Sequence, residues 1–484
     1  AKVTAIPVKI NGVDLTNTNS SAEGLTITTT LSGLGTLTQG GNSILNLSVP
    51  DAQFTLSNLV ASASGNTVNY NGTAQTVRPV TYHNLTLSIS GIKTMAGVTT
   101  VNGNLVMSGS TSATTEASLS IGGNLTVGGS ASLTVGPYDF TVAGASTVSG
   151  QLTHASNLGT KLYVGLVSVS GDWINSGNAN VTFRGGLDGD ISASGAGDGV
   201  YTFDTTSNQT IASGSAVTFK NLTIASGVTV TNNGSVNVTG AFNVAGAWVQ
   251  GTSSSLSIGG TYSIASLNAS AVGNTVRYTS ASPQAVIGGT YHHLVLSGGS
   301  VKTLPANLTT LNGNLTISSD TSTTLAADLT VVGNVTIDSG ATLDVSTSNF
   351  AINLRGNWTC STSSGALVAR SGLVTLQGTV SQRLEGGDCV FNNLTLNNAA
   401  GAYLDDTSMM VNGALTLTNG MLDTGTKTLI MGSDGSITGA SDTRYILGSL
   451  GKTFAVSGSS QNFTFPIGDA TAYTPVEFSV DGVS

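Results

Sequence analysis

The sequence predicts an all-β protein, an elongated β-solenoid (β-helix) of short strands. Three observations support this prediction: a period-two alternation of apolar and polar residues, glycine-rich turns between the alternating stretches, and longer repeats of both. Among 484 residues, charged types make up only 8% and Gly occurs 63 times. Glu occurs four times and Lys eight times, so these long helix formers are scarce, which argues against helices. A hydrophobic content of 39% is enough to bury a core, which argues against disorder.

Short stretches of aliphatic residues alternate with Thr and Ser along most of the chain. Period two places one set of side chains on a buried face and the other set outward. Asn-Gly, Gly-Gly and Ser-Gly between the stretches supply the backbone conformations that tight turns require. No helical apolar stripe is present. Representative stretches are 119–121, 125–127, 133–135, 315–317, 329–331 and 335–337.

The N-terminal segment alternates but lies outside the repeats, and we expect residues 1–60 to form a strand segment or cap. Its apolar members are Val3, Ile6, Val8 and Ile10, and Pro7 suits an edge strand. Two readings are open. The segment is either the first strand of its own solenoid, or an assembly strand added to a neighbouring subunit.

Longer repeats are superimposed on the fine period. Residues 65–70 (GNTVNY) return as 273–278 (GNTVRY), and 82–88 return as 291–297 with Tyr-His at the start of each. Weaker copies start at Gln209 and Gln382, and a Gly-x-Trp step accompanies three copies. We place the solenoid repeats at 61–445, with copies near 65–105, 171–240, 246–317 and 356–420.

These motifs, in this order, resemble repetitive regions of large secreted surface proteins of bacteria. In that family a Gly-Asn-Trp step, a Gln-x-Ile step and a Tyr-x-Asn-Leu-Thr-Ile strand follow one another. The tail segments 422–425, 436–439, 445–450 and 465–468 are similar too, so the resemblance spans about residues 60–475. It implies a β-solenoid in a secreted, cell-surface or filamentous protein, and it implies no catalytic residues.

Stacking explains why such repeats would form a column. A repeat whose strands have one apolar face cannot bury that face alone, and stacking on the next copy buries it. At about 20 residues per coil and about 4.8 Å per coil, the chain makes about 24 coils, a rod on the order of 110 Å. Residues 446–484 are expected to form a small β-sandwich-like element. Its last strand, 473–480, has no closing partner, so either the chain continues past Ser484 or a neighbour completes it.

Composition and cysteine use indicate the compartment. A formal net charge of −9 without a basic cluster makes nucleic acid an unsuitable partner. No apolar run approaches the roughly 20 residues that cross a bilayer. Cys360 and Cys389 form either one disulfide in an oxidising compartment or two buried thiols. A chain that begins at Ala1 suits a mature product after signal removal, or a fragment. We expect an extracellular or cell-surface location.

The sequence contains many Asn-x-Ser/Thr triplets, which are acceptors for N-glycans. A repeated Asn-Leu-Thr strand entry explains much of this excess without any sugar, and both readings stay open. The candidate glycosylation sites are Asn84, Asn124, Asn221, Asn314, Asn334 and Asn393.

The acidic residues do not form a catalytic pattern. Glycoside hydrolysis needs two carboxylates some 5–10 Å apart, whereas Asp405 and Asp406 would point to opposite faces of a strand. One cluster, Asp188, Asp190 and Asp198, is a candidate Ca²⁺ site through oxygen ligands, with a solvated turn as the alternative. We expect no other cofactor and no enzymatic activity.

Histidine and tryptophan both follow the repeats. His83 and His292 occupy equivalent copies, so duplication explains them better than metal binding does; His154 and His293 are the other two histidines. The three tryptophans are either core residues at a coil corner or a platform for sugars. They are Trp173, Trp248 and Trp358.

Together these observations favour a structural, self-associating secreted protein, a subunit of a filament, fibre or surface layer whose partners are copies of itself. The alternative is an adhesin stalk or a carbohydrate-binding surface protein with glycan partners. A polysaccharide-degrading enzyme is the least favoured class.

Overall fold

The computed structural model describes residues 3–5, 7–205, 207–361, 366–387, 389–456 and 459–481. Strands account for 51% and helix for 1%, which confirms the all-β prediction. The chain forms a β-solenoid of about 23 turns of parallel stacked strands, close to the expected number of coils. It divides into two compact units, which we describe separately: unit 1 comprises residues 1–249 with 261–266, and unit 2 comprises 250–260 with 267–484.

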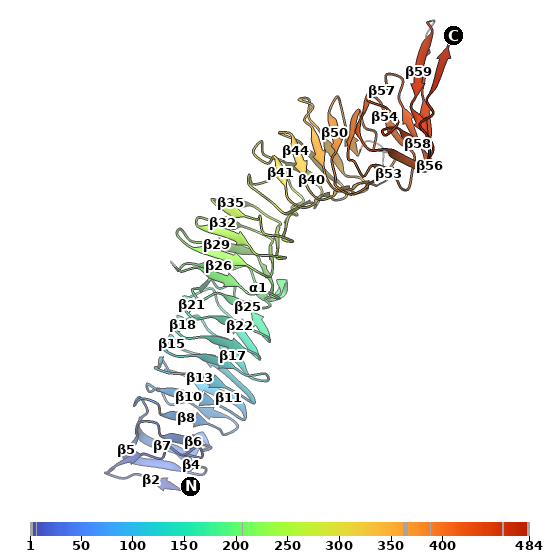
Figure 1. Cartoon of the computed structure of the whole chain (residues 1–484). Coiled ribbons are helices and arrows are strands. Elements are labelled where there is room, and N and C mark those ends of the chain that lie inside the picture. Colours follow the sequence, from blue (N-terminus) through green and yellow to red (C-terminus); the bar gives the residue numbers. More distant parts are fainter. Residues whose placement is uncertain are drawn as a thin grey trace. The chain divides into compact units, whose positions relative to one another are not determined.

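In unit 1 each central turn contributes one strand to each of three parallel sheets (Figure 1). The first sheet contains β1 (Val3–Ala5), β4 (Leu25–Ile27), β6 (Ile44–Leu47), β8 (Thr67–Tyr70), β10 (Asn84–Leu87), β13 (Leu105–Met107), β16 (Leu125–Val127), β19 (Ser146–Val148), β22 (Val167–Val169), β25 (Leu187–Gly189), β27 (Gln209–Ile211) and β30 (Thr229–Asn232). The second contains β9 (Gln75–Thr76), β11 (Ser90–Met95), β14 (Ser110–Thr115), β17 (Ser132–Val135), β20 (Gln151–His154) and β23 (Asp172–Ile174). The third contains β12 (Thr100–Val101), β15 (Leu119–Ile121), β18 (Phe140–Val142), β21 (Lys161–Tyr163), β24 (Val181–Phe183), β26 (Val200–Phe203), β29 (Asn221–Ile224), β32 (Phe242–Val244) and β35 (Tyr262–Ile264).

A short helix interrupts the second side of unit 1. The helix α1 (Ala193–Ala196) packs against β23 and against β28 (Ala216–Phe219), which pairs with β31 (Ser235–Val238). Ser192 caps it, because its Oγ accepts from the Gly195 N–H at 3.1 Å. The remaining strands near the end of unit 1 and the start of unit 2 are β33 (Ala247–Gln250) and β36 (Leu267–Asn268).

Unit 2 has the same three-sided architecture. Its first sheet contains β34 (Ser255–Ile258), β37 (Thr275–Tyr278), β39 (His293–Leu296), β42 (Leu315–Ile317), β45 (Val335–Ile337), β48 (Trp358–Cys360), β51 (Gln382–Glu385), β53 (Ala402–Leu404), β54 (Met409–Val411), β56 (Leu422–Met431), β58 (Ile446–Lys452) and β60 (Ile467–Gly468). The second contains β38 (Gln284–Ala285), β40 (Ser300–Thr303), β43 (Thr321–Thr324), β46 (Thr342–Asp344) and β49 (Leu367–Val368). The third contains β41 (Thr310–Leu311), β44 (Leu329–Val331), β47 (Ile352–Leu354), β50 (Leu373–Leu376), β52 (Asn393–Asn397), β55 (Ala414–Asn419) and β57 (Ser436–Thr438).

The strand register follows the repeat period. Leu85 pairs with Leu105, which pairs with Leu125, so one turn takes 20 residues here, and all three side chains are fully buried. Thr86 and Thr126, which directly follow Leu85 and Leu125, lie on the outward face and are half-buried. The alternation read from the sequence therefore separates a column of stacked aliphatic side chains from an outer face of hydroxyls.

The duplicated segments adopt the same internal structure in the two units. The hydroxyls of Tyr70 and Tyr82 are 2.8 Å apart in unit 1, and those of Tyr278 and Tyr291 are 3.0 Å apart in unit 2. The second tyrosine of each pair donates to a backbone carbonyl of the preceding loop. All four rings are buried, so this pair ties a loop to the core of its turn.

Both ends of the chain contribute strands. The first sheet of unit 1 includes β1, β4 and β6, so residues 1–60, expected to form a strand segment or cap, contribute stacked strands. Beside them β5 (Leu31–Gln39) pairs with β2 (Val8–Lys9), β3 (Asp14–Asn17) and β7 (Phe54–Val60), and η1 (Asp51–Gln53) precedes β7. At the other end, β59 (Gln461–Phe465) and β61 (Val476–Val480) form an antiparallel hairpin, which is a two-stranded sheet and not the expected sandwich.

Candidate functional site

The sequon asparagines form hydrogen-bonded ladders between successive turns. The Asn84 Oδ1 accepts from the Asn104 N–H at 2.9 Å, and the Asn104 Oδ1 accepts from the Asn124 N–H at 2.8 Å. Unit 2 repeats the pattern, with Asn314 Oδ1 accepting from the Asn334 N–H at 2.9 Å. Asn124, Asn221, Asn334, Asn357 and Asn393 accept in the same way from the turn that follows. All six candidate glycosylation sites therefore occupy ladder positions.

The ladder explains why Asn-Leu-Thr recurs. The Leu faces the core, the Thr faces outward, and the Asn amide satisfies a backbone N–H that lies at a corner between two strands. In Asn84, Asn221 and Asn393 the Nδ2, the atom to which a glycan is attached, donates to a backbone carbonyl at 2.9–3.0 Å. Glycosylation stays a prediction, and at these three positions it would have to displace that hydrogen bond.

Three of the four glutamines of the Gln-x-aliphatic step cap carbonyls of the preceding turn, whereas the Nε2 of the fourth, Gln209, is buried without a partner. The Gln75 Nε2 donates to the carbonyls of Leu47 and Val49 at 2.8 and 3.1 Å. Gln284 and Gln382 make the equivalent bonds in unit 2. All three side chains are buried, so each glutamine replaces a strand hydrogen bond at a corner where the backbone bends away.

Buried lysines also bind carbonyls, which the sequence reasoning missed. The Lys161 Nζ donates to the carbonyls of Leu158 at 2.6 Å and Tyr138 at 2.8 Å. The Lys302 Nζ donates to Ser280 at 2.5 Å and Gly299 at 3.1 Å, and Lys93 donates to the Gly72 carbonyl. Burial lowers the pKa of all three ammonium groups, that of Lys93 to about 8. Lys93 and Lys302 are each followed by Thr in the two copies of the duplication, which was the available signal for them; Lys161 is followed by Leu and had no such signal.

A buried aromatic cluster surrounds His154 in unit 1. Its Nε2 lies 2.8 Å from the Tyr163 hydroxyl, and its ring lies 4.8 Å from that of Trp173. Burial, and then the Lys161 charge, lower the pKa of His154 from 6.5 to about 3. This histidine is therefore a neutral core residue. His83 directly precedes the ladder residue Asn84 in the sequence.

The three tryptophans are core residues. Trp173 is 3% exposed, and Trp248 and Trp358 are fully buried. The Trp173 Nε1 donates to the Tyr201 hydroxyl at 3.0 Å. The ring centroids of Trp358 and Phe391 are 5.2 Å apart. They cannot serve as exposed platforms for sugars, and that reading is wrong for the folded chain.

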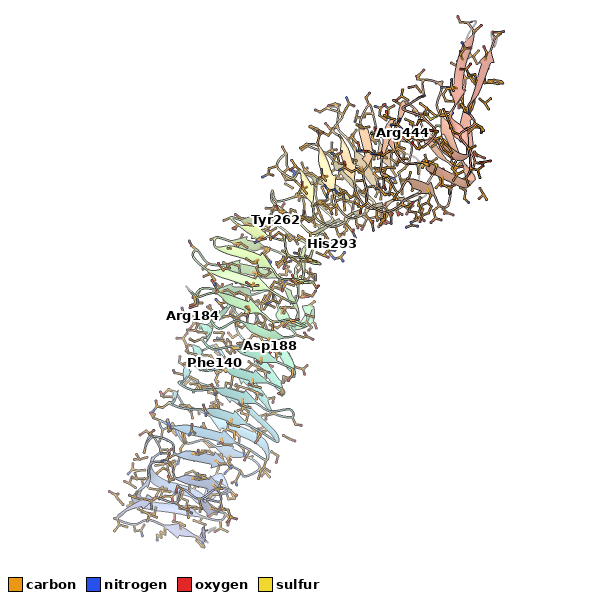
Figure 2. The ribbon with its side chains drawn as sticks, viewed as in Figure 1. Phe140, Arg184, Asp188, Tyr262, His293 and Arg444 are labelled. Atoms are coloured by element: carbon orange, nitrogen blue, oxygen red, sulfur yellow. A yellow bond between two sulfur atoms is a disulfide. The ribbon has the colours of Figure 1, made fainter. Side chains whose placement is uncertain are left out.

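The structure does not gather the acidic residues proposed to bind Ca²⁺. Asp188 is exposed on β25 (Figure 2), and the Asp190 Oδ1 accepts from the Ala216 N–H at 2.7 Å. Asp198 pairs instead with Lys220 at 3.1 Å. Within the described ranges, no three or more His, Cys, Asp or Glu side chains come together as a metal-binding group.

Other acidic side chains pair with arginines across neighbouring turns. Arg184 bonds to Asp204 at 2.7 Å, and Arg370 bonds to Asp344 at 2.6 Å. Asp405 lies 3.1 Å from Arg383. Exposed pairs of this kind contribute little to stability, because solvent screens them.

One hollow contains two carboxylates. A depression of about 380 Å³ next to α1 is lined by residues that include Asp172, Trp173 and Asp190. Both aspartates are exposed, and Asp190 is engaged with the backbone as described. The hollow is formed where α1 interrupts the second sheet, so it is a consequence of the interruption.

Cys360 and Cys389 are joined as a disulfide, with their Cα atoms 6.1 Å apart. Cys360 ends β48, and both residues are buried. Of the two readings that the sequence left open, the structure has the disulfide.

The N-terminal strand residues pair within their own chain. β1, which starts at Val3, pairs with β4, and Val8 in β2 pairs with Leu31. Ile10 is 3% exposed, and Ile6 lies outside the described residues.

No family model, no curated protein and no solved structure matches this chain. Among the described residues, no helix is long and apolar enough to cross a membrane.

Proposed function

We propose that this chain is a non-enzymatic structural protein of the cell exterior, a subunit of a filament, fibre or surface layer that grows by stacking of solenoid ends. The observation that carries the proposal is the continuous stacking within each unit: turn after turn is held by parallel strand pairs and by Asn, Gln and Lys side chains that bond between turns. Repeated bonds between neighbouring turns are the source of stability on which a stacked structural subunit would depend.

Two further features support a location outside the cell. A buried disulfide is typical of oxidising compartments. The outward faces carry Thr, Ser and Asn in place of charged residues, and only 8% of the chain is charged. A hydroxyl-covered surface is stable over a wide range of ionic strength, because few charge pairs are available for salt to screen.

The first turn of unit 1 supplies the surface for a second copy. β1, β2 and β3 each pair on one side only within the described chain. Next to these open strand edges, Val13, Leu15 and Leu34 are 63%, 43% and 82% exposed. Unpaired strand edges with apolar neighbours favour pairing with another chain.

Negative-stain microscopy of the purified protein tests the proposal. We expect ordered fibres from the wild type, and no fibres from a deletion of residues 1–10 or from Leu15→Lys. Val380→Lys is the matched control, because Val380 is 70% exposed but lies between β50 and β51 of unit 2. Monomers of the wild type at every concentration would overturn self-association.

The alternative is an adhesin stalk or carbohydrate-binding surface protein. The same column would serve as a stalk, but the burial of the three tryptophans removes the sugar platform that the sequence offered. Persistent monomers that bind a glycan array would favour this alternative. Shortening of a polysaccharide by the protein would restore the enzyme reading.

A further inference from the structure

One step of the asparagine ladder is made by a histidine. His293 begins β39 (Figure 2), directly before Leu294, just as Asn314 stands directly before Leu315. Leu294 and Leu315 are register partners, so His293 occupies the ladder position of its turn. Its Nδ1 accepts from the Asn314 N–H at 2.9 Å, the bond that an asparagine Oδ1 makes at the other steps described above.

The two kinds of acceptor differ in their response to acid. An amide oxygen stays an acceptor at any ordinary pH, whereas an imidazole nitrogen accepts only while it carries no proton. The bond to Asn314 therefore requires neutral His293 with its proton on Nε2. Protonation of Nδ1 would place two donors against each other and leave the Asn314 N–H without an acceptor.

The surroundings oppose any rearrangement that would relieve this conflict. The ring of His292 lies 4.3 Å from that of His293, and its Nδ1 is buried without a partner. Both Nδ1 atoms approach Gly313 so closely that a Cβ there would lie within 2.5–2.6 Å of them. The two imidazoles therefore occupy the space beside Gly313 that a side chain there would need.

Few other titratable groups face the step. Among the elements packed on β39, the strand β37 carries Arg277 and Tyr278, while β42 and the 312–314 turn carry none. Arg277 pairs in register with Val295, two residues along from His293. Burial, and then His292, lower the pKa of His293 below 6.5. No carboxylate in these elements is placed to stabilise the imidazolium.

We propose that the His293–Asn314 step is a pH-sensitive joint in unit 2, closed in neutral solution and open in acid, between asparagine steps that stay closed. The sign follows from the lowered pKa. The folded state prefers the neutral ring, so the stabilisation is complete above pH 6.5 and is lost as the pH falls below that value. Opening would loosen β39 from β42 and leave the rest of the column paired.

Hydrogen exchange read by mass spectrometry tests the joint directly. Exchange of a peptide containing the Asn314 amide is compared at pH 7.5, 6.5, 5.5 and 4.5, after correction for the intrinsic pH dependence. In the wild type, the protection factor of this amide should fall by up to about tenfold for each unit by which the pKa of His293 is lower in the folded state than in the unfolded state. His293→Asn restores the ladder consensus and should keep its protection throughout the range.

His83→Asn is the matched control, because His83 occupies the duplicated Tyr-His position in unit 1 while its ladder residue is Asn84. It should follow the wild-type pH profile. Equal profiles for the wild type and His293→Asn would overturn the proposal. If His293→Asn fails to fold, NMR of selectively labelled wild-type protein decides. The chemical shift of the Asn314 amide should change over the same pH range as the protonation of His293. An amide shift that does not follow the titration of His293 would overturn the proposal.

Discussion

Acidification should destabilise unit 1 through His154, which is fully buried. Its pKa is lowered from 6.5 to about 3 by burial and by the nearby Lys161 charge. Because the folded state prefers the neutral ring, stability is complete above pH 6.5 and is lost as the pH falls toward 3. At about 1.36 kcal/mol per pKa unit, we expect a loss of about 2 kcal/mol at pH 5 and at most about 5 kcal/mol in stronger acid.

Urea unfolding followed by Trp173 fluorescence measures this loss, because the Trp173 ring lies 4.8 Å from that of His154. Trp248→Phe and Trp358→Phe together remove the other two tryptophan signals. In this background His154→Phe keeps an aromatic ring in the cluster but cannot be protonated. Its free energy of unfolding should fall by about 2 kcal/mol less than that of the parent between pH 7 and pH 5. Parallel declines in the two proteins would refute the reasoning.

Three further experiments test the forces that hold the turns together. Asn124→Ala removes one ladder hydrogen bond and should lower the free energy of unfolding by about 1 kcal/mol in urea titrations; no change would mean that water replaces the amide. Breaking the disulfide by Cys360→Ser with Cys389→Ser should cost about 3–4 kcal/mol for a separation of 29 residues, measured by thermal unfolding with and without reductant. Trp358→Ala should cost about 3–5 kcal/mol and Thr336→Ala about 0.5 or less, because the first is fully buried and the second faces outward; similar losses would contradict the assignment of faces.

The fold class and the turn length could be predicted because both depend on local pattern. Period-two alternation sets which side chains point inward, and the expected coil of about 20 residues agrees with the register of Leu85, Leu105 and Leu125. The duplication places Tyr70 and Tyr278 at matched positions in two copies, and the structure has the same tyrosine contact in both. These features need no information about distant contacts.

Other features depend on what a side chain meets one turn away. Lys161 reads as a surface residue in the sequence, yet its ammonium group is bound by carbonyls at a corner. The sequence reasoning gave His293 no role, and its ladder role appears only when Asn314 is placed beside it. The tryptophans were ambiguous because an indole suits both a core and a sugar platform, and burial decides between them.

The stacking of turns in register is the central claim, and a pair of cysteines tests it most directly. Thr126 and Thr147 are register partners in adjacent turns, whereas Ser168 lies one turn further on. Neighbouring Cα atoms would be about 4.8 Å apart and next-neighbours about 9.6 Å, while a disulfide needs less than about 7 Å. Under mild oxidation, Thr126→Cys with Thr147→Cys should form a disulfide, detected by mass spectrometry of the linked peptides, and Thr126→Cys with Ser168→Cys should not. Linkage of the second pair, or failure of the first in folded protein, would contradict the stacked solenoid.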